Sequence, residues 1–416
     1  MLSIFTPTHK STHLLEAYSS IVQQTFKDWE WVIVPNNGIK SIPDRIIRDK
    51  RVRVVCGGES LHNVGALKRF ACDSCAGNGF VELDHDDLLL PGNTLQKIND
   101  AFRAGAGFAY SDTAVFRYRP TDAPEDNKDN PAPVFKHYTY SRQHGWENYP
   151  ITVYGRYLAV TRNFEVTPRS LSEILYAPDH VRSWSRKAYY EAGGHDRELS
   201  VCDDHALMIK TYLSGAKFQH IGGCGYLYRS YDHNTVLVRN KKIQELSREH
   251  KMLYLGKLIT KWASYDNRKT LNITELLRDG WKFDRDLLLG FGSDAYAHII
   301  ADVELQKLPS WQVREFMNNA YAALIPGGYL TITVPEVHSG MGYADVEWQS
   351  HFSTTSMSPY TRKDFAIANG KVTCRFQEVD CFELYPSDWH KDRGFKYLRF
   401  TLCALKGQRQ PGLQHI

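Results

Sequence analysis

The chain has 416 residues, of which 42% are hydrophobic and 24% charged, and its formal net charge is +4. This composition excludes an intrinsically disordered chain, and the length predicts two or three folded domains. The mild positive charge neither predicts nor excludes a nucleic-acid partner.

Cysteine usage and hydropathy bear on the compartment. Eight cysteines in a chain of this length are too sparse for a disulfide scaffold, so we expect reduced thiols in a cytoplasmic protein. The apolar run Leu2-Ser3-Ile4-Phe5 is too short for a signal peptide, and no apolar stretch is long enough to span a bilayer. We therefore expect no stable membrane insertion, and the oligomeric state stays open.

Apolar strands alternate with helices over the first part of the chain. Strands are expected at 2–5, 29–34, 52–55 and 79–83, and helices at 14–21 and 63–75. This alternation predicts a mostly parallel sheet with right-handed crossovers. Because α/β sheets bind ligands at the carboxyl ends of their parallel strands, we expect Thr6, Asn36 and the stretch from Asp84 to Asp87 to gather at one edge.

The fourth of these strands ends in Asp84-His85-Asp86-Asp87. Three carboxylates within four residues repel one another and lose hydration on burial, so something must compensate for their charge. Mn²⁺ or Mg²⁺ suits such oxygen ligands, which the ion binds together with substrate phosphates. The alternative is a solvated acidic turn that caps the following helix.

Several ordered blocks resemble family 2 glycosyltransferases, which have the GT-A fold. The stretch from Ser20 to Glu30 is similar to their opening "S-x-x-x-Q-T-F-x-x-W-E" block, and Asn63-Val64-Gly65-Ala66 followed by the acidic stretch is similar to the central block that ends in "D-x-D". Tyr110-Ser111-Asp112 resembles the strand after it. The resemblance covers about residues 1–240. It implies metal-dependent, inverting transfer of a sugar from a nucleotide-diphosphate sugar to an acceptor hydroxyl.

The resemblance also implies roles for residues on the donor side. The metal ligand is expected to be Asp86, with Asp84 nearer the ribose, Asp87 in support and His233 as a further ligand. Donor contacts are expected from Thr6, Pro7, Asn36, Asn37, Asp84 and Arg229, the last through the diphosphate. The family usually carries acidic residues in place of Asn36-Asn37, where one commonly contacts the base. The base of the donor, uridine or another, therefore stays open.

An acidic pair marks the acceptor side. Asp203-Asp204 follows Gly193-Gly194-His195-Asp196 and precedes a predicted helix. This order resembles the acceptor-side block of the family, and implies that Asp204, or else Asp203, takes the proton from the acceptor hydroxyl. The alternative is simple capping, because the helix dipole favours carboxylates at this position.

The class of acceptor stays open. A polar stretch at about 120–148 is expected to be a long insertion, and basic and aromatic residues are interleaved between Phe135 and Trp146. Such residues can stack on bases or sugars, or pack as ordinary surface. A surface or lipid-linked glycan is the family's commonest acceptor. Hydroxymethylated bases of phage DNA are the alternative, with phosphate contacts from Lys136, Arg142, Arg156 and Arg162. A sugar-nucleotide or glycan binding protein without turnover is a further alternative.

A connecting helix and linker at 241–269 are expected to separate this domain, residues 1–240, from a second α/β domain at 270–416. The run from Leu324 to Pro335 resembles the fifth-strand region of class I S-adenosylmethionine-dependent methyltransferases, which need a glycine-rich turn after their first strand. Here Leu271-Asn272-Ile273-Thr274-Glu275 contains no glycine. We therefore expect a smaller, Rossmann-like, methyltransferase-type domain without cofactor binding. A bifunctional glycosyltransferase/methyltransferase is the alternative.

Overall fold

The computed structural model describes residues 1–36, 41–57, 61–116, 142–230, 234–278, 292–302, 305–368, 370–407 and 409–412. Asn37, Lys136, His233 and most of the expected polar insertion lie outside these ranges. The chain forms two compact units that divide between Leu258 and Ile259, inside the long helix α9 (Asn240–Ala263). Among the described helices, none is both long enough and apolar enough to cross a bilayer.

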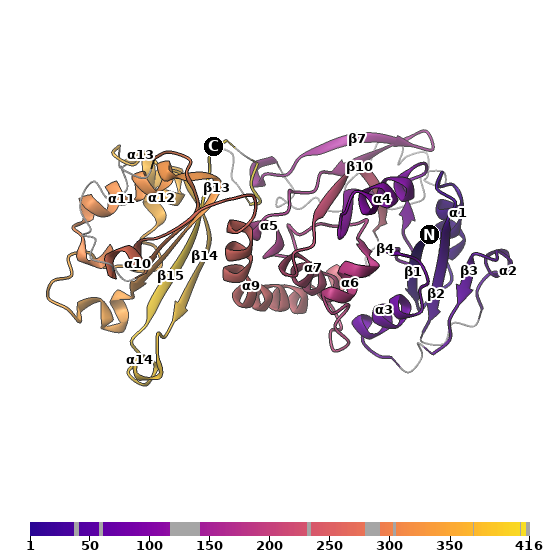
Figure 1. Cartoon of the computed structure of the whole chain (residues 1–416), viewed down its shortest axis with the longest axis horizontal. Coiled ribbons are helices and arrows are strands. Elements are labelled where there is room, and N and C mark those ends of the chain that lie inside the picture. The colour runs from indigo at the N-terminus through magenta and orange to yellow at the C-terminus, as the bar shows by residue number, and fades with distance from the viewer. Residues whose placement is uncertain are drawn as a thin grey trace. The chain divides into compact units, whose positions relative to one another are not determined.

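The first unit is built on a mixed sheet (Figure 1). Strands β1 (Leu2–Thr8), β2 (Trp29–Pro35), β3 (Val52–Val54) and β4 (Gly79–Glu82) are parallel and lie in the order β3-β2-β1-β4. The sheet continues through β9 (Ser183–Ser185), β6 (Phe108–Phe116), β10 (Phe218–Arg229) and β5 (Leu88–Leu89), while β8 (Arg156–Thr161) joins β6 to β7 (Asn148–Val153). The expected parallel sheet is thus confirmed for its first four strands, and β9 enters it antiparallel to both neighbours.

Both faces of this sheet are covered by helices. On one face, α1 (Leu14–Val22) and α4 (Thr94–Arg103) contribute Leu14, Ile21 and Ile98 to a buried cluster with Ile4. Because side chains alternate along a strand, Phe5 points to the opposite face, where its ring lies 6.0 Å from that of His195. That second face carries α3 (Val64–Asp73), α6 (Arg186–Glu191) and α7 (Asp203–Leu213).

The remaining elements of the first unit are short. They are α2 (Asp44–Ile47), η4 (Arg142–His144), α5 (Pro168–Leu171) and α8 (Thr235–Val238). The long strand β10 is interrupted by two glycines. Gly222 and Gly223 have φ values of +76° and +72°, and the pairing with β6 shifts register between His220 and Cys224. The glycines thus form an irregularity inside one strand.

The second unit has its own sheet and core. Strands β11 (Thr270–Asn272), β12 (Tyr296–Asp302) and β13 (Leu324–Pro335) are parallel, and β15 (Tyr397–Ala404) pairs antiparallel with both β13 and β14 (Phe376–Leu384). Its helices are α10 (Ile273–Arg278), α11 (Ser310–Ala323), α12 (Ser358–Thr361), α13 (Lys363–Ala368) and α14 (Asp388–Asp392), with short turns at η6 (Leu305–Lys307), η7 (Val337–Ser339) and η8 (Met341–Tyr343).

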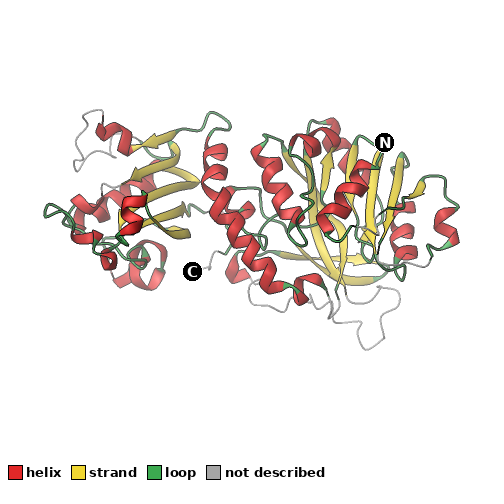
Figure 2. Cartoon of the chain, turned by 90° about the horizontal axis from the view of Figure 1, so that it is seen from below, coloured by secondary structure: helices red, strands yellow, loops and turns green. Residues whose placement is uncertain are grey.

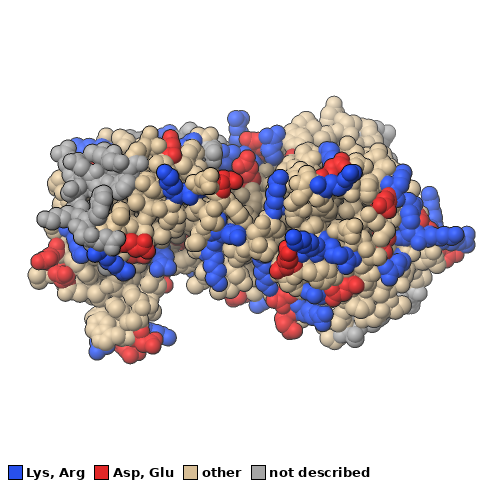
Figure 3. All heavy atoms as spheres, viewed as in Figure 1, with Lys and Arg blue, Asp and Glu red and all other residues tan. Residues whose placement is uncertain are grey.

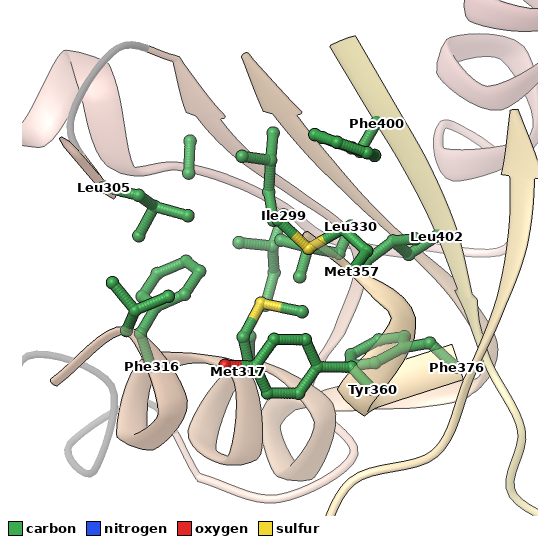
Figure 4. Close-up of a cluster of buried hydrophobic side chains, with 14 of the residues drawn as sticks. Ile299, Leu305, Phe316, Met317, Leu330, Met357, Tyr360, Phe376, Phe400 and Leu402 are labelled. Atoms are coloured by element: carbon green, nitrogen blue, oxygen red, sulfur yellow. The ribbon is translucent and has the colours of Figure 1, made fainter. Parts of the chain in front are cut away.

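The core of this unit lies between its sheet and its helices. Figure 4 shows Phe316 and Met317 of α11 pointing toward Ile299 and Leu330 of the sheet. Each of these four side chains is at most 4% exposed. Figure 2 shows that each unit combines a sheet with helices beside it, so the α/β expectation is confirmed for both.

Candidate active site

The carboxyl ends of β1, β2 and β4 lie at one edge of the first sheet, as expected. Asn36 is buried there, and its backbone N–H donates to the carbonyl oxygen of Thr8 at 2.8 Å. The hydroxyl of Thr6 donates to the carbonyl oxygen of Leu83 at 2.6 Å and accepts from Nε1 of Trp31 at 2.9 Å. Thr6 therefore links β1 to β2 and to the residue that follows β4, and Pro7 follows it in β1. The donor role expected of these residues stays a prediction.

The acidic turn after β4 is held in place by β10. The backbone N–H of Asp84 donates to the hydroxyl oxygen of Tyr226 at 3.1 Å. Oδ1 of Asp87 accepts from the backbone N–H of Arg229 at 2.6 Å. Asp87 is 1% exposed and Asp86 is 9% exposed, so a freely solvated acidic turn is excluded. Burial of carboxylates costs free energy, which makes compensation by a cation the better interpretation.

Arg229 was expected to contact the donor's diphosphate, and the structure gives it partners inside the protein. Its Nε donates to the carbonyl oxygen of Asp86 at 2.6 Å, and its Nη2 donates to Oε2 of Glu16 at 2.6 Å. The guanidinium also lies 4.6 Å from the ring centre of Phe116. Through these bonds Arg229 connects the acidic turn to α1. Its contact with the diphosphate of the donor stays a prediction.

The electrostatics of the turn fit a divalent cation. Burial, reinforced by the charge of Glu82, raises the pKa of Asp84 to about 7. Burial, reinforced by Asp86 and Asp84, holds the pKa of Asp87 well above its ordinary value. Within the part of the chain that the structure describes, Oδ2 of Asp87 is buried without a hydrogen-bond partner. Crowded carboxylates with a shortage of positive charge are the ligand chemistry that Mn²⁺ and Mg²⁺ require.

A second grouping of ligand atoms shares one carboxylate with this turn. Carboxylate oxygens of Glu82 and Asp84 and a ring nitrogen of His180 lie within 4.8 Å of one another. However, Nη2 of Arg182 lies 3.1 Å from Oε1 of Glu82 and 3.0 Å from Nε2 of His180. A positive guanidinium therefore already lies against this grouping, and the ligand role expected of Asp86 stays a prediction.

A buried lysine links the donor-side strand to the acceptor-side helix. Nζ of Lys68, from α3, lies 2.9 Å from Oε1 of Glu82 in β4 and 3.1 Å from Oδ2 of Asp203 in α7. The close packing of α3 requires Gly65, because a Cβ at this position would lie 1.9 Å from the carbonyl oxygen of Asp196. The predicted carboxylates of the two sides are thus joined through residues that sequence reasoning missed.

The acidic pair begins α7, as expected, and its two members differ in environment. Oδ2 of Asp204 accepts from Nη1 of Arg182, and its Oδ1 accepts from the backbone N–H of His205 at 2.7 Å. Burial would raise the pKa of Asp204, but the charges of Arg182 and Lys68 outweigh it and hold the pKa below its ordinary value. Burial raises the pKa of Asp203 to about 6 against the opposing charge of Lys68.

Exposure also separates the two carboxylates. The side chain of Asp204 is 15% exposed, whereas that of Asp203 is 4% exposed and lies 3.6 Å from Nε2 of His195. Asp203 therefore faces the interior instead of the amides of the first helical turn, so simple capping does not describe it. Asp204 is therefore the more accessible of the pair, and its role as the proton acceptor stays a prediction.

Basic and aromatic residues of the expected acceptor region have mixed environments. Trp146 is 4% exposed, and its ring centre lies 4.7 Å from that of Phe164, so it packs in a core and cannot stack on a base or a sugar. Nη1 of Arg162 lies 3.0 Å from Oε2 of Glu147. Lys136 and the side chain of Arg156 lie outside the described residues. On the face shown in Figure 3, basic and acidic side chains are interspersed.

No protein-family model matches the sequence, and the comparison with curated proteins gives no match. Among solved structures, residues 1–349 of TarS from S. aureus align with 78% of this chain and 83% of their own length, at 15% identity and a TM-score of 0.38. The same TarS piece in complex with UDP-GlcNAc is 13% identical to this chain and aligns with 89% of this chain and 87% of its own length, with a TM-score of 0.39.

A mannosyltransferase, PcManGT from Pyrobaculum calidifontis in complex with GDP-Man and Mn²⁺, gives 14% identity over 67% of this chain and 79% of its own, with a TM-score of 0.38. Likenesses this distant fix neither the substrate nor the reaction of this chain.

Proposed function

We propose that the first unit is a glycosyltransferase that moves a sugar from a nucleotide-diphosphate sugar to an acceptor hydroxyl. One observation carries this proposal. Arg182 pairs with both Glu82, the last residue of β4, and Asp204, at the start of α7, and a carboxylate oxygen of Asp84 lies within 4.8 Å of one of Glu82. A cation-binding carboxylate beside an ionised, accessible carboxylate is the pair of functions that such a transfer needs.

On the donor side, Asp84 and Asp86 are the residues that would hold Mn²⁺ or Mg²⁺. When bound, the cation neutralises charge on the diphosphate leaving group as a Lewis acid. Asp87 supports the turn through the backbone of Arg229. Asn36 stands at the strand end where a carboxylate would favour a particular base, so the base of the donor stays open.

On the acceptor side, Asp204 accepts the proton from the attacking hydroxyl. Its ionised state at neutral pH follows from Arg182, which bonds its Oδ2. One direct displacement at the anomeric carbon inverts its configuration, and the leaving group carries away the bonding electron pair. We propose a glycan hydroxyl as the acceptor. Transfer to a hydroxymethylated base in DNA is the other outcome that the experiment must distinguish.

For the second unit, we propose that it does not bind S-adenosylmethionine. Helix α10 begins at Ile273, directly after β11 ends at Asn272, so no glycine turn separates them. Without that turn the backbone cannot approach a cofactor closely at the end of β11. We propose instead that the second unit binds the acceptor, forms a dimer contact or supports the first unit.

The experiment is a survey of nucleoside-diphosphate release. The full chain would be incubated with Mn²⁺ and a panel of UDP- and GDP-sugars, with and without glycan acceptors and hydroxymethylated duplex DNA. We expect release from at least one donor and an inverted product by NMR. A protein that only binds sugar nucleotides would bind a donor in calorimetry without releasing the diphosphate, and that result would reject the proposal.

A further inference from the structure

Arg182 makes contact with three segments that the proposed reaction needs. It lies directly before β9 and is 8% exposed. Its Nη1 bonds Oδ2 of Asp204, and its Nη2 lies 3.1 Å from Oε1 of Glu82. The same Nη2 lies 3.0 Å from Nε2 of His180. One guanidinium therefore joins the acceptor-side carboxylate to the strand that ends in the acidic turn.

The contact with His180 extends this connection to the donor side. The ring of His180 stacks on that of Tyr226, with centres 4.3 Å apart and planes 11° from parallel. The hydroxyl of Tyr226 accepts from the backbone N–H of Asp84 at 3.1 Å. The planar fork of an arginine can hold two partners in fixed directions, which the single ammonium of a lysine cannot do. The position of Asp204 is thereby fixed relative to Asp84.

We propose that Arg182 is a positioning residue for the transfer reaction: it holds the carboxylate of Asp204 in an ion pair and so fixes it beside the donor site. This inference rests on the proposed function, because it is in the proposed reaction that Asp204 accepts a proton from the acceptor hydroxyl. Arg182 itself touches neither reacting atom, and it acts through Asp204 and Glu82.

The other groups that face Asp204 leave Arg182 as its main cation. Lys68 of α3 is the second cation, and it is shared with Glu82 and Asp203. Nε2–H of His205 donates to the carbonyl oxygen of Leu171 at 2.8 Å, so its Nδ1 accepts from Nδ1–H of His250 at 3.3 Å. Burial lowers the pKa of His205 to about 4 and also lowers that of His250, so both rings are neutral.

Removal of Arg182 together with its partner Glu82 would therefore leave two carboxylates, Asp203 and Asp204, facing the one ammonium of Lys68. Asp204 would then hold a proton more tightly, because a like charge disfavours ionisation and the opposite charge that favoured it has gone. The expected change is an upward shift of the Asp204 titration midpoint by about 1–3 pH units, the usual effect of a neighbouring arginine on an aspartate.

The experiment reads the carboxylate itself, so it does not depend on turnover. The full chain would be labelled with ¹³C at the aspartate side-chain carboxyl, and the Asp204 signal would be assigned by its absence in Asp204→Asn. The test variant is Glu82→Gln/Arg182→Gln, which removes a buried charge pair together and so avoids leaving Glu82 unpaired. Arg182→Lys keeps the charge without the fork. Arg186→Gln is the matched control, because Arg186 bonds the carbonyl oxygens of Gly77 and Cys75 and, among the described residues, pairs with no carboxylate.

We expect Asp204 to stay ionised to the lowest pH at which the wild-type protein and Arg186→Gln remain folded. In Glu82→Gln/Arg182→Gln its midpoint should rise, and in Arg182→Lys it should stay low. An Asp204 midpoint that is the same in wild type and in the double variant would overturn the inference. Failure of the wild-type protein to release a nucleoside diphosphate would reject the proposed function, and the carboxyl titration would still report on Arg182.

Discussion

Nζ of Lys68 lies 3.1 Å from Oδ2 of Asp203, so helices α3 and α7 meet at a buried ion pair. Both side chains are less than a tenth exposed. Burial alone would lower the pKa of Lys68, but the carboxylates of Asp203 and Glu82 hold it well above its ordinary value. Lys68 is therefore a permanent positive charge between the two sides of the candidate active site.

Replacement of this lysine should destabilise the protein strongly. Lys68→Met leaves Glu82 and Asp203 with one cation fewer, and breaking a buried pair in this way costs about 3–5 kcal/mol of unfolding free energy. Urea denaturation would measure the loss. Lys187→Met is the control, because Lys187 is 83% exposed in its pair with Glu191 and should change stability little. Equal stability of Lys68→Met and wild type would contradict the buried cluster.

The pKa of Asp84 predicts a pH-dependent response to metal. Its folded-state pKa of about 7 lies above the value for an unfolded chain, so the folded state binds the proton more tightly. This contribution to the free energy of unfolding is therefore present at low pH and is lost as pH rises toward 7. A metal needs the ionised carboxylate, so stabilisation by Mn²⁺ should be larger at about pH 8 than at about pH 5.

Thermal unfolding with and without Mn²⁺ at both pH values would measure this effect. Asp84→Asn should reduce the pH dependence, because the amide does not titrate, while Asp87 keeps its raised pKa. The same Mn²⁺-induced shift at the two pH values in the wild-type protein would show that Asp84 is not a ligand.

The metal prediction for turnover concerns Asp86. Asp86→Ala should lower turnover by about 10²–10³-fold, the usual effect of removing one electrostatic contact to a transition state. Release of nucleoside diphosphate at saturating donor and Mn²⁺ would be compared with that of Asp44→Ala, an exposed carboxylate of α2 that should have no effect. Undiminished activity of Asp86→Ala, or of the wild type in EDTA, would reject metal dependence.

The second unit should not bind S-adenosylmethionine, because α10 follows β11 without a glycine turn. Titration calorimetry of the full chain would test this, with a nucleotide sugar as the positive control for an active preparation. Binding of S-adenosylmethionine at micromolar concentration would revive the bifunctional alternative.

Part of this architecture could be predicted from the sequence because its signals are local. Continuous apolar runs mark β1, β2 and β4, and apolar residues at helical spacing mark one face of α1. The acidic turn comes soon after the end of β4. Strands β5 and β9 could not be predicted in this way. They have two and three residues, too few for an alternating pattern, and their places in the sheet come from their neighbours.

The charge pairs of the site could not be predicted because a charge does not specify its partner. Glu82 and Arg182 are 100 residues apart, and Arg229 and Glu16 are 213 residues apart. The one sequence signal for Lys68 was its place on the buried face of α3, three residues after Gly65. A lysine on a helix face of small residues indicates a buried acidic partner, since an unpaired charge at that place would be costly.

In the proposed reaction, Asp204 takes the proton of the acceptor hydroxyl during glycosyl transfer. The most direct measurement compares release of nucleoside diphosphate by wild type, Asp204→Asn and Asp203→Asn, together with donor binding by calorimetry. Asp204→Asn keeps the shape of the side chain and removes the proton acceptor, so turnover should fall by about 10²–10⁴-fold while donor affinity changes little. Wild-type turnover in Asp204→Asn, or release by no variant from any donor, would contradict the account.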